Sequence, residues 1–185
     1  MRWRGTRWPV AIASVLLPAL LMAGCGPQTT QQVFDVPNCR IDASGTMILM
    51  AQAVPTASQL PCIKDMPEGW SFGGIDVKSG LAQFWLDSDR AGMSALKVLL
   101  TASCRPTGTQ IPSDQLGSSL YLKIRKLGNR YVADRIYLLA RGCITYRLNF
   151  PNGEKAVLTT DAITAIGQLS RRQLALFLRG QGYTL

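Results

Sequence analysis

The sequence contains no histidine and few charged residues, and both shortages limit what the protein can do. Without histidine, catalysis by Ser-His-Asp or Cys-His groups, metal sites built on imidazole and pH sensing by imidazole are excluded. Charged residues make up 17% of the chain and hydrophobic residues 47%, which is too apolar for a disordered chain. The 185 residues suffice for one domain with a hydrophobic core. We therefore expect a folded protein, and no cofactor or metal is indicated.

The beginning of the chain is typical of a secretory signal peptide. Arg2, Arg4 and Arg7 precede residues 10–24, which carry no charge. This stretch is shorter than the roughly 20 apolar residues that a membrane-spanning helix requires. We therefore expect export of the protein, with residues 1–24 as the signal peptide.

The signal ends in Leu21-Met22-Ala23-Gly24-Cys25, which resembles the lipobox of bacterial lipoprotein precursors. In that family a diacylglycerol is attached to the cysteine thiol, and cleavage leaves the lipidated cysteine as the first residue. Ala23 and Gly24 match the small residues of the pattern, whereas Met22 stands where leucine or valine is usual. The resemblance implies a lipid anchor at Cys25, on the outer face of the cell membrane or on the outer membrane of a diderm source. An ordinary secretory signal followed by a chance cysteine is the alternative.

Downstream of the signal, residues 25–37 are expected to be the lipidated cysteine and a flexible tether, because residues 26–32 are polar and uncharged. Residues 38–185 are expected to form a single extracytoplasmic domain. The signal carries three of the 20 basic residues, so the mature chain would keep 17 basic against 11 acidic residues, a net charge of +6.

Four cysteines remain when Cys25 is set aside, an even number in an oxidising compartment. They predict two disulfides, for which three pairings exist. Cys104 and Cys143 each follow a strand-like segment, and neighbouring strands would align them. We therefore favour Cys104–Cys143, which leaves Cys39–Cys62. Metal binding is the alternative, against which the lack of histidine and of any Cys-x-x-Cys pair argues.

Basic residues gather between residues 121 and 147, where Asp134 is the one acidic residue. Near an anionic membrane each basic side chain contributes about 1 kcal/mol, so this cluster could orient an anchored domain. The solvated face of a sheet is the alternative interpretation. Nucleic acid is not an expected partner of an exported protein, despite the charge. The candidate docking residues are Lys123, Arg125, Lys126, Arg130, Arg135 and Arg141.

Alternating hydrophobicity predicts an antiparallel sheet built from hairpins. Residues 47–62 are expected to enter as an extended segment that joins the core, and residues 105–119 as a loop. The expected strands are a hairpin within residues 70–87, then residues 95–102, 121–125, 131–140 and, as the final strand, 144–150.

Toward the C-terminus the apolar spacing becomes helical. Asp161 is expected to cap a first helix that runs through Ile163 and Ile166. Ser170 and Gln173 match a capping box that starts a second helix. The predicted fold class is therefore α+β: an antiparallel sheet with two short C-terminal helices packed on it and two disulfides.

Two patterns suggest catalysis, and each has a structural explanation. Ser94 and Lys97 match the Ser-x-x-Lys pattern of penicillin-binding proteins and β-lactamases. Ser94 is expected to start a strand, however, whereas that mechanism needs both residues on one helical turn. Asp87 and Asp89 could pair as the acid and base of a glycosidase, but a turn between strands accounts for them. We expect no catalytic residues, with an envelope hydrolase as the least favoured alternative.

Several segments between residues 53 and 178 form a recognisable pattern: Ala53-Val54-Pro55, Pro61-Cys62, Gly69-Trp70, Asp89-Arg90-Ala91-Gly92, Cys104 and Gly142-Cys143-Ile144-Thr145-Tyr146. On this pattern the chain resembles a family of actinobacterial secreted or lipid-anchored proteins of unknown function. The resemblance implies an exported, single-domain body with four structural cysteines, and it implies no catalytic residues.

Two non-enzymatic functions fit these expectations. The first is a docking module that binds a membrane-proximal envelope protein or anionic lipid headgroups. The second is a carrier that holds an apolar or lipid ligand in a cleft between sheet and helices. A carrier needs an apolar pocket of several hundred Å³, whereas a docking module has a filled interior and an exposed patch. The aromatic residues that would line such a cleft are Trp70, Phe84, Trp85, Tyr131, Tyr137 and Tyr146.

Overall fold

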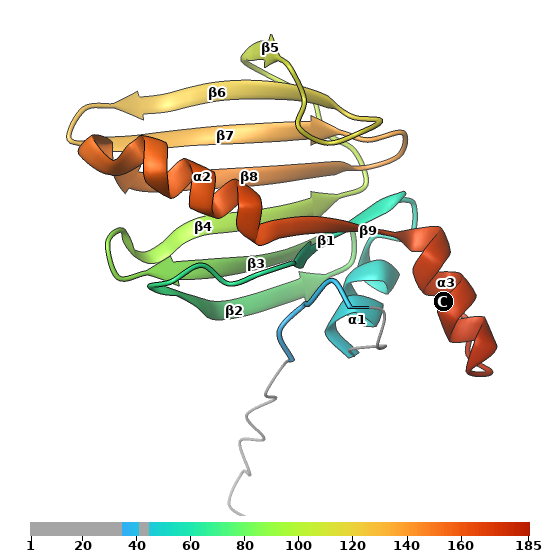
Figure 1. Ribbon diagram of the computed structural model, residues 1–185. Coiled ribbons are helices and arrows are strands. Elements are labelled where there is room, and N and C mark those ends of the chain that lie inside the picture. The colour runs from blue at the N-terminus through green and yellow to red at the C-terminus, as the bar shows by residue number, and fades with distance from the viewer. Residues whose placement is uncertain (1–34, 41–44) are drawn as a thin grey trace, which may run out of the picture. The chain divides into compact units, whose positions relative to one another are not determined.

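The computed structural model describes residues 35–40 and 45–185, and seven of their strands form one antiparallel sheet. These strands are β2 (Trp70–Lys78), β3 (Leu81–Ser88), β4 (Gly92–Thr101), β5 (Thr109–Ile111), β6 (Ser119–Leu127), β7 (Arg130–Leu138) and β8 (Cys143–Pro151). Their order across the sheet is β2-β3-β4-β8-β7-β6-β5 (Figure 1). β2, β3 and β4 are neighbours in chain order, and so are β5, β6, β7 and β8. The pairing of β8 with β4 joins these two units into one sheet.

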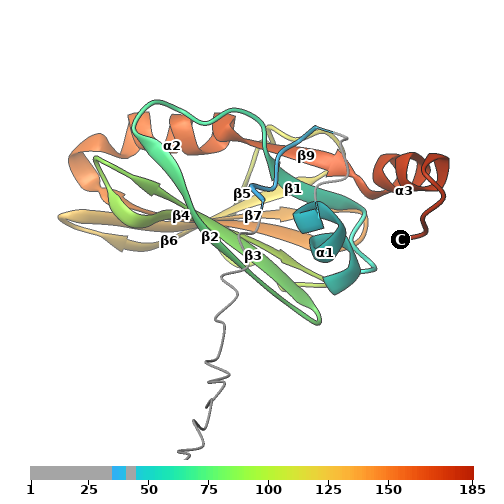
Figure 2. The ribbon, with the colours of Figure 1, turned by 90° about the horizontal axis from the view of Figure 1, so that it is seen from below.

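A two-stranded ribbon and short helices complete the described fold. The ribbon pairs β1 (Gln59–Ile63) with β9 (Ile166–Ser170) in antiparallel register. The helices are α1 (Gly45–Ala53), α2 (Lys155–Ala165) and α3 (Arg171–Gly180), with a 3-10 turn at Asn152–Glu154. Figure 2 shows α2 and the β1–β9 ribbon on one face of the seven-stranded sheet, which we call the inner face. The α+β class predicted from the sequence is thus confirmed.

The core lies between the inner face and these covering elements. Along β3 buried and half-buried residues alternate strictly, and β8 follows the same period. Period-two alternation places every second side chain on the inner face, where burial stabilises each large apolar residue by about 1.5–3 kcal/mol. The side chains with no exposed surface include Phe84, Leu86, Leu96, Val98, Leu100, Leu120, Ile144, Tyr146, Leu148 and Phe150.

The N-terminal part of the fold differs from the sequence-based expectation. Residues 47–62 were expected to be extended, but residues 45–53 form α1 and only residues 59–63 form a strand. Met47, Met50, Ala51 and Val54 are all buried, at the spacing of one helical face. The prediction was wrong because a helix that is apolar on most sides has no polar face to reveal its period.

The C-terminal part also departs from expectation. Asp161 lies inside α2, which begins at Lys155, and does not cap a helix. Residues 166–170 are β9 and not helix, so β8 is not the final strand. Ser170 does precede α3 as predicted, but its side chain makes no capping hydrogen bond. Leu174 and Leu178 of α3 are buried in the core.

Within the sheet, two local features were not expected. The hairpin of β2 and β3 turns at Ser79 and Gly80, whereas Gly73 and Gly74 form a bulge inside β2. Gly74 has φ of 151°, and the ring of Trp85 lies directly over it, so a side chain there would collide with the indole. The short strand β5 lies within the segment expected to be a loop.

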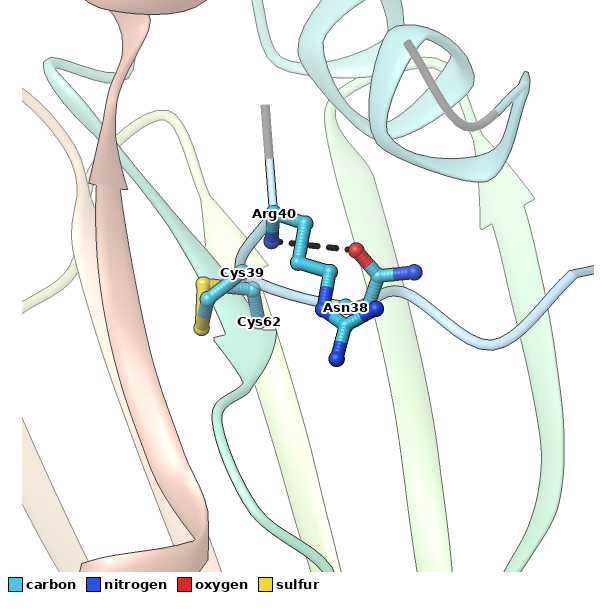
Figure 3. Close-up of a disulfide and its surroundings, with 4 residues drawn as sticks. All are labelled: Asn38, Cys39, Arg40 and Cys62. Atoms are coloured by element: carbon cyan, nitrogen blue, oxygen red, sulfur yellow. Dashed lines mark hydrogen bonds between the residues drawn. A yellow bond between two sulfur atoms is a disulfide. The ribbon is translucent and has the colours of Figure 1, made fainter. Parts of the chain in front are cut away.

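The four cysteines form two disulfides, Cys39–Cys62 and Cys104–Cys143, the pairing that the strand argument favoured. Figure 3 shows how the first bond fastens the described N-terminal segment to β1. Backbone hydrogen bonds reinforce this attachment, from the Cys39 amide to the Ile63 carbonyl (3.0 Å) and from the Ile63 amide to the Pro37 carbonyl (2.6 Å). Two disulfides indicate an oxidising, extracytoplasmic environment.

The predicted signal peptide, Cys25 and most of the predicted tether lie outside the described residues. Contacts along the chain group Val33–Leu185 into one compact unit. In the part of the chain that the structure describes, no helix is long and apolar enough to cross a membrane.

Candidate basic docking surface

The exposed half of β6 is the most accessible part of the predicted basic cluster. It consists of residues 123–127, which we call the β6 tip, and all five residues are exposed. The neighbouring edge strand β5 pairs only with residues 120–122 of β6. No described strand pairs with the edge of the β6 tip that faces away from β7, so the β6 tip is a free edge of the sheet. Lysine is common at such edges, where it prevents pairing with a further strand.

Cationic and apolar side chains alternate in the β6 tip. Lys123 and Lys126 point away from the inner face, whereas Ile124 and Leu127 are on the inner-face side. Ile124 is nevertheless 52% exposed and Leu127 61% exposed. The covering helix α2 packs mainly against β8, two strands away, and its first residue, Lys155, reaches only as far as the Tyr131 ring of β7 (5.9 Å). The surface thus combines positive charge with apolar area.

Asp134 on β7 neutralises part of the basic cluster. Its carboxylate accepts from Arg125 (Nη2 to Oδ2, 2.6 Å) and from Arg147 (Nε to Oδ1, 3.2 Å), and Asp134 is only 3% exposed. Two arginines are therefore held by one acid. By contrast, no described residue forms an ion pair or side-chain hydrogen bond with Lys123 or Lys126, so their charges remain available.

Arg135 and Arg141 do not belong to this surface, which corrects the expectation of one six-residue surface, whereas Arg130 lies on the same face of the sheet as Lys123 and Lys126 but is not free. Arg130 is fixed by hydrogen bonds to Asn149 Oδ1 (2.7 Å) and to two backbone carbonyls. Arg135 lies on the inner face, where it is bonded to the Tyr137 hydroxyl and to Asp114. Arg141 follows the opposite end of β7. Strand alternation and strand length separate residues that are close in sequence.

The acidic candidates are held by structural contacts. Asp87 accepts a hydrogen bond from the Ser94 amide (2.6 Å), which closes the turn between β3 and β4. Arg90 forms ion pairs with Asp89 (4.0 Å), Glu154 (3.8 Å) and Asp161 (2.7 Å). A polar pocket of about 370 Å³ lies beside this network. Because the carboxylates converge on one arginine, the network fastens α2 to the β3–β4 turn.

Ser94 and Lys97 are not arranged for mutual activation. Both belong to β4, where residues three apart point to opposite faces. Ser94 has φ of 52° at the start of the strand, and Lys97 lies over the ring of Trp85 (5.7 Å). The expectation that Ser94 belongs to a strand is confirmed.

Most of the aromatic candidates fill the core. Trp70 packs edge-on against Phe150 (centroids 6.1 Å apart), and Tyr137 lies beside Tyr146 (4.9 Å). Burial raises the pKa of both tyrosines above the usual value of 10. Trp85 instead lies half-buried on the face opposite the inner one. These positions do not form the wall of one cleft.

Two acidic residues that organise the cations were not predicted as part of the site. Asp134 stood out only as the single acid in a basic segment, and Asp114 lay in an expected loop. Asp114 accepts from the Tyr137 hydroxyl (3.3 Å) and from Arg135 (3.4 Å). An isolated acid amid alternating strand residues is a usable signal, because a buried carboxylate requires cationic partners.

Comparison with protein-family models finds no match, and searches of the curated proteins and of the solved structures find no significant match either. The function of the protein is therefore inferred from its sequence and the geometry of its surface.

Proposed function

We propose that this protein is a lipid-anchored, non-enzymatic module of the cell envelope that docks on an anionic lipid surface through the β6 tip. The observation that carries the proposal is the coexistence of two uncompensated lysines and two exposed large apolar side chains in five consecutive residues. Each lysine near an anionic surface contributes about 1 kcal/mol. Ile124 and Leu127 would add the free energy of burying apolar surface, as in other interfacial anchors.

The lipobox-like segment supports such a location. Were Cys25 lipidated, Asp35, the first described residue, would follow it by ten positions, with nine residues between them. Ten steps along a fully extended chain span at most about 35 Å. The domain would therefore stay close to the membrane, and a weak docking contact would suffice to orient it because the tether keeps its local concentration high.

The carrier alternative has less support. Side chains on the inner face, such as Phe84, Leu100 and Tyr146, have no exposed surface and occupy the space between sheet and covering elements. A hydrolase has less support as well, because Asp89 and Asp161 pair with Arg90 and because Asp87 closes a turn. A protein partner at the free edge is the outcome to be distinguished by experiment.

The test is flotation of the oxidised mature chain, with Cys25→Ser to remove the lipid, on vesicles containing phosphatidylglycerol. We expect binding that weakens with salt, and at least a tenfold loss in the Lys123→Glu/Lys126→Glu variant, because four units of charge change at the contact. Vesicles of phosphatidylcholine alone should bind weakly.

The matched control is Lys64→Glu/Lys78→Glu, which makes the same charge change at exposed lysines outside the β6 tip. It should retain most of the binding. Equal losses in both variants would show that net charge, and not the β6 tip, attracts the vesicle. Absence of binding by the parent chain would contradict lipid docking and favour a protein partner.

A further inference from the structure

A second basic site lies at the other end of the sheet. It is an open pocket of about 400 Å³ beside the start of α3 and the loop between β7 and β8. Of the residues that the structure describes, four arginines line it and no acidic residue does. Its lining residues are Ser58, Gln59, Arg141, Ser170, Arg171, Arg172, Ala175 and Arg179.

Backbone hydrogen bonds hold the parts of this pocket in place. Ser58 donates to the Arg141 carbonyl through both its amide (2.9 Å) and its hydroxyl (3.1 Å), and its own carbonyl accepts from the Arg171 amide (3.0 Å). Gly142 has φ of 90° and packs closely against Ala57. The loop that carries Arg141 is therefore fixed against the beginning of α3, and the pocket is largely preformed.

The positive charges of the pocket are not compensated within the described part of the chain. The Arg141 and Arg172 side chains have no ion pair or hydrogen bond there. Arg171 donates to the carbonyls of Ala51 (2.7 Å) and Val54 (3.4 Å), and Arg179 to that of Ala175 (3.3 Å). Burial and then the charge of Arg141 lower the pKa of Arg171. Like charges held together without a counter-charge destabilise one another, and a bound anion would relieve that repulsion.

We propose that this pocket binds a phosphate group. Guanidinium groups present planar forks of donors that match the oxygens of phosphate, and charge-assisted bonds of this kind are among the strongest in proteins. Arg141 and Arg172 supply the free forks, while Arg171 is positioned by α1 and adds charge. The hydroxyls of Ser58 and Ser170 line the same space.

This site is independent of the lipid-docking surface proposed above. The β6 tip precedes the turn that leads into β7, whereas Arg141 follows the far end of that nine-residue strand. Nine strand residues extend about 30 Å. A domain docked through the β6 tip would therefore keep the pocket open to a second ligand.

The experiment is calorimetric titration of the oxidised mature chain carrying Cys25→Ser with inorganic phosphate, at constant ionic strength set by chloride. We expect saturable binding and a phosphate-dependent rise in Tm. Arg141→Gln and Arg172→Gln should each weaken binding at least tenfold. Arg40→Gln, which removes an arginine outside the pocket, should leave it unchanged, as should Lys123→Glu/Lys126→Glu.

Thermal unfolding without phosphate tests whether each variant is folded. Because Arg141→Gln removes a repulsive charge and no contact, its Tm should equal or exceed that of the parent chain, while the rise with phosphate disappears. Absence of a phosphate effect on the parent chain would overturn the proposal, as would equal weakening by Arg40→Gln.

A second arm distinguishes the source of the phosphate group. Displacement of inorganic phosphate by vesicles of phosphatidic acid, lost in Arg141→Gln, would assign the pocket to a lipid headgroup. Displacement by glycerol 3-phosphate and not by vesicles would assign it to a soluble phosphate ester. Either result supports the site.

Discussion

The buried hydroxyls of the neighbouring residues Tyr137 and Tyr146 differ in their hydrogen bonding. The Tyr137 hydroxyl lies between Asp114 and Arg135 and is bonded to both. The Tyr146 hydroxyl is buried near Gln168, yet among the described residues no hydrogen bond of ordinary geometry satisfies it. An unsatisfied buried polar group reduces stability, whereas an apolar replacement of the same shape does not. The two residues therefore make opposite predictions.

We predict that Tyr146→Phe leaves the free energy of unfolding unchanged or raises it by up to about 1 kcal/mol at pH 7. Tyr137→Phe, the matched control, removes two hydrogen bonds and should lower it by about 1–2 kcal/mol. Urea denaturation of the oxidised chain measures both changes. A loss in Tyr146→Phe as large as that in Tyr137→Phe would show that the Tyr146 hydroxyl has a strong partner.

Tyr146→Phe should also change how the free energy of unfolding depends on pH above about pH 9. Burial raises the pKa of Tyr146, so the folded state keeps a proton that the unfolded state loses above pH 10. Deprotonation of the unfolded state therefore lowers the free energy of unfolding as the pH rises above 10. The loss is about 1.4 kcal/mol for each such tyrosine at about pH 11, and the full stability is present below pH 10. Tyr146→Phe should therefore lose less stability between about pH 9 and 11.

At the scale of elements, contacts distant in sequence decide which segments become helix or strand. β9 exists because residues 166–170 pair with β1, about a hundred residues earlier in the chain. Likewise, Arg171 supplies the donor for the Ala51 carbonyl at the end of α1. Local propensity is a weak guide where such pairing overrides it.

The disulfides are the covalent counterpart of these distant contacts. Cys104–Cys143 joins residues 39 apart, and Cys39–Cys62 joins residues 23 apart. For loops of this size the restriction of the unfolded chain contributes about 3–4 kcal/mol. We predict that Cys104→Ser/Cys143→Ser lowers the free energy of unfolding by about that amount, and Cys39→Ser/Cys62→Ser by slightly less.

Urea denaturation of the two double variants, with peptide mapping of the oxidised parent chain, checks this prediction. Mapping should recover linked peptides that contain Cys39 with Cys62 and Cys104 with Cys143. Any other linkage contradicts the pairing. Parent-like stability of either double variant would show that its cross-link does not restrict the unfolded chain.

At the scale of the whole molecule, the described fold buries one face of its large sheet and leaves the other without a covering helix (Figure 2). Basic residues gather at two separate places in it, the β6 tip and the arginine pocket. A net charge of +9 for the chain says nothing of this division, because charge placement follows strand register and loop position.

The proposed anchor can be tested on the full precursor. We predict that Cys25→Ser leaves an unprocessed chain without diacylglycerol, because the lipid is attached through the thiol. Intact-mass measurement of the membrane fraction distinguishes precursor from lipidated product. Met22→Leu, which restores the usual residue of the lipobox, should be processed at least as well as the parent. Normal cleavage of Cys25→Ser with release into the medium would contradict the lipobox interpretation.

The sequence by itself determined the α+β class, most of the strands of the large sheet, the start of α3 and the presence of two disulfides, and it favoured among three pairings the one that the structure contains. The elements follow from local periodicity and turn residues, which short segments of the sequence contain, and the disulfides follow from the even number of cysteines. The register of β3 was not among these features, because Phe84, Trp85 and Leu86 are all apolar in sequence, and only the structure shows that Phe84 and Leu86 are buried while Trp85 is half-buried.

Only the tertiary structure decided which basic residues share a surface. Arg135 and Asp134 are adjacent in sequence but lie on opposite faces of the sheet, and Arg141 joins arginines that follow it by thirty residues or more. The same holds for α1 and β9, whose conformations depend on pairing and packing partners elsewhere in the chain. Such long-range contacts leave no local pattern, because their energy arises only when the distant segments meet.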